Sequence, residues 1–152
     1  MTTLDDIFDL QEEELISSLP GFQTKILKEL LAVDSDHLSV ADKWLNAKPS
    51  NTVGFGGAGI RNHIYRDKIL EELEKFVCGD EKYQLDREKL GSATNGTVQY
   101  IIGSIATAIG STMGITGAVI APVIVLLLIT GGKISKNGWC EARRAIRAAS
   151  QP

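Results

Sequence analysis

The chain of 152 residues contains 43% hydrophobic and 23% charged residues, with a mean hydropathy of +0.02 and a formal net charge of −3. This length has room for one compact domain and a membrane element, and it excludes large catalytic architectures of the α/β kind. The charge is unevenly distributed. Residues 1–90 carry 11 Lys or Arg against 18 Asp or Glu, a net charge of −7, whereas residues 91–152 carry 5 against 1, a net charge of +4.

The first 90 residues are predicted to be helical, because apolar residues recur three or four positions apart and strand signals are almost absent. Thr3 is expected to cap a first helix that ends at Pro20, and a second helix is expected to begin near Phe22. These helices can share apolar faces, so the pattern predicts a small N-terminal helical bundle.

A short third helix is predicted around Trp44, because Ser39 followed three residues later by Asp42 resembles a capping box. Residues 46–59 then interrupt the helical pattern with a proline and four glycines. A longer helix follows this interruption, and Gly79 is expected to end it.

The glycine-rich interruption contains Gly54, Gly56 and Gly59, which match the Gly-x-Gly-x-x-Gly pattern before a helix. No strand precedes the motif, which argues against dinucleotide binding, and Ile60 and Arg61 occupy the Lys and Ser/Thr positions of a P-loop. Helix N-termini bind anions, so Gly54, Gly56, Gly59 and Arg61 form a candidate anion site that would sense a nucleotide signal. The alternative is a flexible connector.

Residues 90–132 form a run of 43 residues without Asp, Glu, Lys, Arg or His, and residues 114–130 are almost wholly apolar. Such a run is typical of a membrane span. It divides near residues 111–116 into two arms, residues 98–110 and 117–130. At 1.5 Å per residue each arm reaches roughly 20 Å, which is short of the ~30 Å thickness of bilayer hydrocarbon.

Three geometries are compatible with these short arms. They are a transmembrane helical hairpin that extends into its polar flanks, a single span with an interfacial first arm, or a hairpin buried in a soluble helical bundle. We favour the transmembrane hairpin, because it leaves both ends of the chain on the cytoplasmic side. Small residues on the first arm permit close helix packing in lipid, which predicts a homo-oligomer interface at Gly103, Ala106 and Gly110.

Basic residues follow the apolar run closely, which predicts a cytoplasmic C-terminus. The N-terminus lacks the pattern of a secretory signal and is expected to stay cytoplasmic too. A basic C-terminal helix is predicted to contact lipid headgroups, and the alternative is an ordinary solvated helix. The predicted membrane-surface residues are Lys133, Lys136, Trp139, Arg143, Arg144 and Arg147.

Catalytic and metal-binding patterns are missing from the sequence. Cys78 and Cys140 are far apart and lack Cys-x-x-Cys spacing, which predicts reduced thiols and no zinc site. No motif of nucleophilic or metal-assisted hydrolysis occurs, so no catalysis and no cofactor are expected.

Leu-Pro-Gly at residues 19–21 is similar to the turn of helix-hairpin-helix modules. Gln23 replaces their second glycine, and the acidic surroundings oppose nucleic-acid binding.

The sequence therefore predicts an all-α protein with a small N-terminal helical bundle, an apolar helical hairpin, predicted to be transmembrane, and a short basic C-terminal helix. The expected parts are an acidic cytoplasmic helical domain (residues 1–90), a joint (91–97), a membrane hairpin (98–131) and a basic tail (132–152).

The expected function is a small membrane protein of effector or toxin type that oligomerises into a pore or disrupts the cytoplasmic membrane. The N-terminal domain would control it through a protein partner or a nucleotide signal. In plan the chain is similar to pore-forming colicins, which attach an uncharged helical hairpin to an amphipathic bundle, although no motif is shared. The alternatives are a membrane-anchored adaptor and a soluble bundle with the hairpin as its core.

Overall fold

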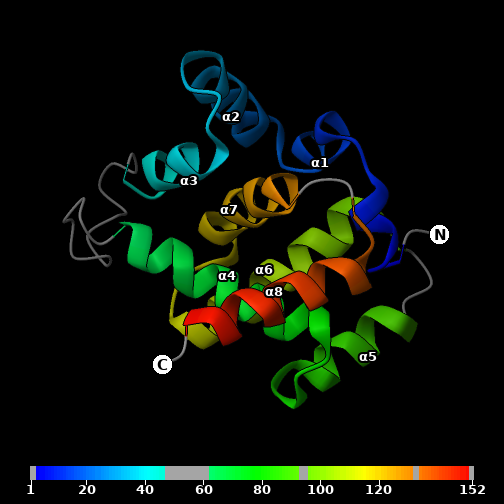
Figure 1. The fold of residues 1–152 in the computed structure, drawn as a ribbon. Helices are drawn as coiled ribbons and strands as arrows, with labels where there is room; N and C mark the ends of the chain where they lie inside the picture. Colours follow the sequence, from blue (N-terminus) through cyan, green and yellow to red (C-terminus); the bar gives the residue numbers. More distant parts are fainter. Residues whose placement is uncertain (1–2, 47–61, 93–95, 132–133, 151–152) are drawn as a thin grey trace.

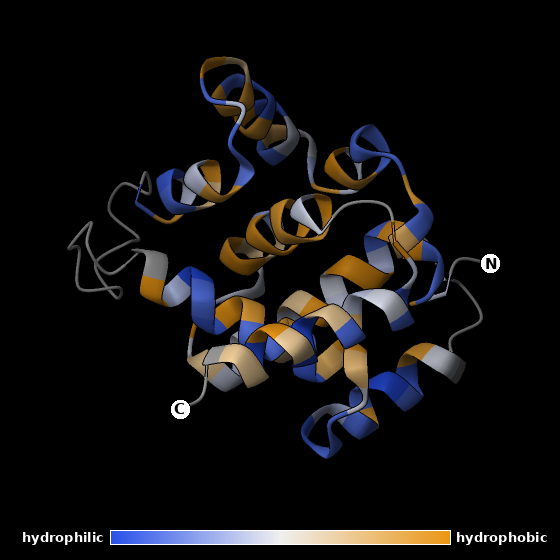
Figure 2. Ribbon diagram, in the orientation of Figure 1, coloured by the Kyte–Doolittle hydropathy of each residue, from blue (hydrophilic) through white to orange (hydrophobic). Residues whose placement is uncertain are grey.

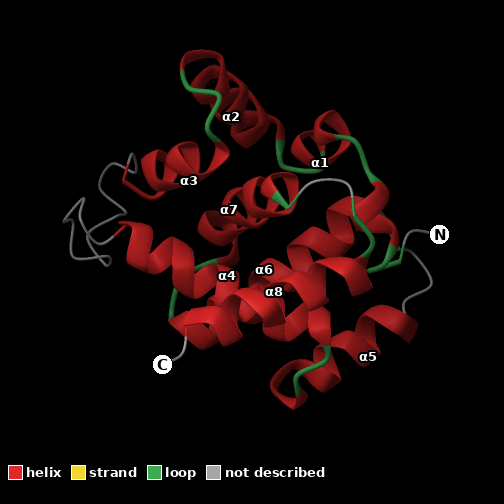
Figure 3. Ribbon diagram, viewed as in Figure 1, coloured by secondary structure: helices red, strands yellow, loops and turns green. Residues whose placement is uncertain are grey.

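The computed structural model describes residues 3–46, 62–92, 96–131 and 134–150, and these residues form helices, turns and loops without a strand (Figures 1 and 3). The predicted all-α fold is therefore confirmed. The helices are η1 (Asp6–Asp9), α1 (Glu12–Ser17), α2 (Gly21–Val33), α3 (His37–Asn46), α4 (Asn62–Cys78), η4 (Glu81–Tyr83), α5 (Gln84–Ser92), α6 (Val98–Met113), α7 (Gly117–Thr130) and α8 (Lys136–Ser150).

Two details of the predicted helices need correction. Thr3 caps the first turn as predicted, since its Oγ1 accepts from the Asp6 amide at 3.3 Å, but the first helix is interrupted at Leu10, whose backbone is extended. Helix α1 begins anew after a capping box between Gln11 and Glu14. Helix α3 is capped by Asp36, whose Oδ1 accepts hydrogen bonds from the Leu38 and Ser39 amides at 3.1 and 3.5 Å. The predicted cap at Ser39 was wrong because the Asp36 carboxylate precedes it and takes the free amides of the first turn.

Helix α7 lies at the centre of the molecule. Helices α1, α3, α4 and α6 all pack against it, and Figure 2 shows its hydrophobic ribbon enclosed by helices of mixed hydropathy. The nine consecutive residues from Ile120 to Leu128 are buried. One cluster of buried side chains includes residues from α1, α2, α3, α4, α6, α7 and α8. The predicted N-terminal bundle and the hairpin therefore share a single core.

Among the described helices, none is by itself both long and apolar enough to cross a membrane. Helices α6 and α7 meet the length and composition requirement only as a pair, and they are bent by 116° at the turn between them. The two predicted arms are confirmed as two adjacent helices, but the membrane span predicted for them is not confirmed.

The turn between α6 and α7 depends on glycine. Gly114 ends α6 with φ +73°, a left-handed conformation that glycine adopts without strain. A Cβ added to Gly110 would collide with the Ile115 carbonyl oxygen, and one added to Gly117 would lie 3.2 Å from the Thr107 amide nitrogen. The two helices therefore approach each other through backbone rather than side chains.

This close approach predicts opposite effects for two glycines of α6. Gly110→Ala is expected to destabilise the fold by about 1–3 kcal/mol, because the new methyl group overpacks the turn. Gly103→Ala has open space around its Cβ and should stabilise the helix by up to about 1 kcal/mol through helix propensity. Urea unfolding of the two variants measures both effects, and equal shifts in the same direction would contradict the turn geometry.

Candidate functional site

The candidate site is the apolar hairpin of α6 and α7 together with the groups that hold it inside the bundle. Helix α7 contains Pro122, which has no N–H and cannot donate to the carbonyl of Ala118 four residues earlier. The buried Gln23 of α2 donates to that carbonyl instead, with Nε2 2.8 Å from the oxygen. Trp44 of α3 donates to the next carbonyl, that of Val119, at 2.9 Å. Both covering helices are thus anchored to the first turns of α7.

A double-mutant cycle tests this pairing. Gln23→Met keeps the size of the side chain but removes the donor, and we expect it to cost about 1 kcal/mol of unfolding free energy. In a Pro122→Ala background the restored amide of residue 122 can bond to the Ala118 carbonyl, so the same change should cost measurably less. Additive effects of the two substitutions, measured by urea unfolding, would show that Gln23 does not compensate for the proline.

Glu72 of α4 connects three helices through its buried carboxylate. Its side chain is 0% exposed, and the Tyr83 hydroxyl donates to Oε1 at 2.6 Å. The same hydroxyl lies 3.0 Å from Oγ1 of Thr112, near the end of α6. Lys82 forms an ion pair with Glu72 at 2.8 Å, and Lys68 and Lys75 approach it to 3.3 and 3.4 Å. The network attaches the tip of the hairpin to α4.

The protonation of this network follows from its partners. Burial alone would raise the pKa of Glu72, but the hydrogen bonds from Lys82 and Tyr83 and the charge of Lys75 outweigh it and lower the pKa to about 2. Burial and the bond to Glu72 raise the pKa of Tyr83 above its ordinary value. At neutral pH the carboxylate is therefore charged, and the phenol keeps the proton that it donates.

Helix α8 is held against α4 by a disulfide between Cys78 and Cys140, whose Cα atoms are 5.8 Å apart. The prediction of two reduced thiols was wrong for this structure, because α4 and α8 bring together two cysteines that are 62 residues apart in sequence. Glu74 of α4, which is buried, also pairs with Arg143 at 3.2 Å and with Arg147. One covalent bond and two ion pairs thus join the same two helices.

The indole of Trp139 covers the C-terminal end of α7. Trp139 is 4% exposed, and its ring centroid lies 5.6 Å from that of Phe8. A Cβ on Gly131 would come within 2.8 Å of the indole Nε1, so the ring lies directly against the backbone that follows α7. We use the name α8 latch for Trp139, Cys140, Arg143 and Arg147.

The predicted membrane-surface residues that the structure describes have partners within the molecule. Lys136 pairs with Asp5 at 2.9 Å, Arg144 pairs with Glu141, and the other two arginines belong to the α8 latch. Lys133 lies outside the described residues. Contact of Trp139 with a membrane would require α8 to leave the core.

The predicted oligomer interface is divided by the fold. Gly103 is exposed, with no atom near a Cβ added to it, whereas Ala106 and Gly110 are buried at the crossing of α6 and α7. The candidate anion site at Gly54, Gly56, Gly59 and Arg61 lies outside the described residues.

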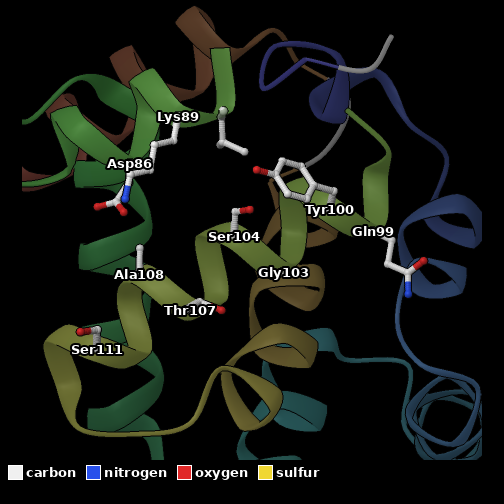
Figure 4. Close-up of a pocket in the computed structure, with 10 residues that line it drawn as sticks. Asp86, Lys89, Gln99, Tyr100, Gly103, Ser104, Thr107, Ala108 and Ser111 are labelled. Carbon is white, nitrogen blue, oxygen red and sulfur yellow. The ribbon is translucent and has the colours of Figure 1, made fainter. Parts of the chain in front are cut away.

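A cleft of about 540 Å³ runs between α5 and the exposed face of α6. Figure 4 shows Asp86 and Lys89 on the α5 side, facing Tyr100 and Ser104 of α6. The α6 side of the cleft carries no charged side chain. Within the described ranges, no group of three or more His, Cys, Asp or Glu side chains is arranged to hold a metal ion. The cleft therefore leaves one face of the hairpin accessible from outside.

Sequence reasoning missed the groups that hold the hairpin in place. Gln23, Glu72 and Glu74 are buried polar side chains on helices that were predicted as simple amphipathic cover. Pro122 was the available signal for one of them, because a proline within a buried helix leaves a carbonyl that needs a donor. The chain matches no protein-family model, no curated protein and no solved structure, so its function is inferred from its own geometry.

Proposed function

We propose that this protein is membrane-active: it keeps the α6–α7 hairpin inside a helical bundle and, after a trigger, inserts the hairpin into a bilayer. Several inserted copies then associate to form a pore or to disrupt the membrane. The observation that carries the proposal is the position of α7, the most apolar part of the uncharged run, at the centre of the fold, where α1, α3, α4 and α6 pack against it.

The chemistry of α7 suits both the core of a helical bundle and the interior of a bilayer. The carbonyls of Ala118 and Val119 accept from Gln23 and Trp44 and would need other donors in lipid. The side chains from Ile120 to Leu128 are apolar, so lipid can replace the protein groups that now surround them. Bundle helices that carry polar outer faces need not enter the lipid. Neither arm reaches the ~30 Å of bilayer hydrocarbon in its present length, so insertion requires the 116° bend to open and the flanking residues to extend the helices.

The fold also supports a second candidate, a soluble helical interaction module in which the hairpin is a permanent core. The single continuous cluster of buried residues favours this alternative, since α7 is already shielded from water. A membrane-anchored adaptor without pore activity is a further variant of the first proposal, because it requires insertion without leakage.

Vesicle experiments with the full chain separate these functions. Unilamellar vesicles of phosphatidylcholine and phosphatidylglycerol are loaded with a self-quenched dye, and protein binding and dye release are measured under reducing and oxidising conditions and over a range of pH. Binding with release supports the pore. Binding that resists alkaline carbonate without release indicates the adaptor, and failure to bind under every condition would refute membrane activity.

Assembly of inserted copies is tested at Gly103. Gly103→Leu is expected to keep the soluble fold, because a Cβ at this position meets no atom within 4 Å, but to reduce dye release at least severalfold by blocking close helix approach in lipid. Gly91→Leu is the matched control, since Gly91 is an exposed glycine of α5 outside the hairpin with equally open surroundings. Equal release by both variants and the unchanged chain would exclude Gly103 from the assembly interface.

A further inference from the structure

The Cys78–Cys140 disulfide closes a covalent ring of chain that contains the hairpin. Cys78 is the last residue of α4 and Cys140 lies in the second turn of α8, 62 positions later, so the segment between them includes α5, α6 and α7. Both ends of the α6–α7 pair are therefore attached to the same point of the bundle. While the ring is closed, α8 cannot move away from α4.

The bridge acts where α8 covers the core. Cys140 is 5% exposed and follows Trp139, the residue that covers the end of α7. On the next turns, Arg143 and Arg147 pair with Glu74 of α4. The Arg147 side chain is 54% exposed, and ion pairs of exposed groups contribute little to stability. The covalent bond is therefore the strongest attachment of α8.

We propose that this disulfide is a redox lock on the hairpin, and that its reduction permits the α8 latch to open and α7 to leave the core. This inference rests on the proposed membrane activity and identifies its trigger. After reduction, α8 is held by non-covalent contacts such as the indole contact, the Glu74 ion pairs and the Lys136–Asp5 pair, so local opening of α8 costs far less than before. Opening uncovers the end of α7 and frees the basic face of α8 for anionic headgroups.

The chemical step is thiol–disulfide exchange with a dithiol reductant. A thiolate of the reductant attacks the sulfur of Cys78, which belongs to the partly exposed residue of the bridge, and the Cys140 thiolate leaves. The second thiol of the reductant then attacks the mixed disulfide and releases Cys78. Two electrons and two protons pass from the reductant to the protein. The reductant becomes a disulfide, and Cys78 and Cys140 become thiols.

The test compares the oxidised full chain, the chain reduced with dithiothreitol, and the Cys78→Ser/Cys140→Ser variant, each added to the dye-loaded anionic vesicles. We expect reduction to raise the initial rate of dye release at least tenfold. The double variant should release dye at the reduced rate with or without dithiothreitol. Far-UV circular dichroism confirms that each form enters the assay folded, and mass spectrometry confirms its thiol state.

Hydrogen exchange in the absence of vesicles supplies a second measurement. Reduction is expected to increase amide exchange in α8 first and then in the C-terminal turns of α7, with α2 and α3 little changed. Equal dye release by the oxidised and reduced chains would overturn the redox lock while leaving the membrane activity in place. Silence of the reduced chain and of the folded double variant, both for binding and for release, would overturn the proposed function and the lock together.

Discussion

Reduction of the Cys78–Cys140 disulfide, or its replacement by two serines, is expected to lower the free energy of unfolding by about 4 kcal/mol. The estimate follows from the sequence separation of 62 that the bridge spans, because cross-linking a long loop removes conformational entropy from the unfolded chain. A domain of this size is commonly stable by only 5–15 kcal/mol, so this loss is a large part of the total. Urea unfolding with and without dithiothreitol measures it directly.

Two controls isolate the contribution of the bridge. The double serine variant should have the same stability with and without dithiothreitol, and it should match the reduced chain within about 0.5 kcal/mol. A midpoint of unfolding that does not change on reduction would show that the two cysteines are not bonded in solution. The α8 latch would then be held by Trp139 and the Glu74 ion pairs alone.

The second large effect is expected at Glu72. Glu72→Gln removes the charge that three lysines and Tyr83 surround at a fully buried site, and we expect a loss of about 3 kcal/mol of unfolding free energy at neutral pH. Glu71→Gln is the matched control. Its carboxylate pairs with Lys68 and Lys75 on the same helix, but its side chain is 53% exposed, so its loss should cost no more than about 0.5 kcal/mol.

The contribution of Glu72 should also disappear in acid. Its pKa falls from an ordinary value of 4.5 to about 2 in the folded protein, so the unfolded chain binds the proton more tightly. The stabilisation is complete above pH 4.5 and is lost as the pH falls from 4.5 towards 2. The stability difference between the unchanged chain and Glu72→Gln, measured by urea unfolding at several pH values, should shrink over this interval. A difference independent of pH would show that packing, not charge, explains the substitution.

These two sites restrain different parts of the hairpin. The Glu72 network reaches Thr112 at the tip of α6, whereas the α8 latch covers the end of α7 near Gly131. Acid strong enough to protonate Glu72 would release the tip but leave α8 covalently bonded to α4, because the disulfide does not titrate. Reduction would release only the far end. A redox trigger and an acid trigger are therefore distinguishable by which of the two ends exchanges its amides first.

Local sequence patterns determined much of the secondary structure. The spacing of apolar residues placed most of the helices, because an amphipathic helix must repeat its buried face every three or four residues. Gly79 ends α4, and Gly114 marks the turn of the hairpin, since both adopt positive φ angles. The prediction failed at Ser39, because the Asp36 carboxylate caps the helix one turn earlier.

The same patterns do not specify which apolar medium surrounds α7. The residues Ile120–Leu128 avoid water equally well in lipid and in a protein core, so an uncharged run predicts burial without naming the environment. In the described structure the core is protein, supplied by helices from both ends of the chain. The enclosure of α7 by protein depends on how all the helices pack together, and no single segment of the sequence predicts it.

The sequence by itself determined that this protein is helical, that its charge is divided between its two halves, and that residues 98–130 form two apolar arms with a turn between them. Only the tertiary structure decided that α7 is enclosed and that Gln23 donates to the Ala118 carbonyl, which Pro122 leaves without a backbone donor. It alone decided that Cys78 is bonded to Cys140. The physical reason is distance along the chain. Helix formation depends on neighbours within a few residues, whereas these contacts join positions 62 to 95 residues apart, which come together only when the whole core packs.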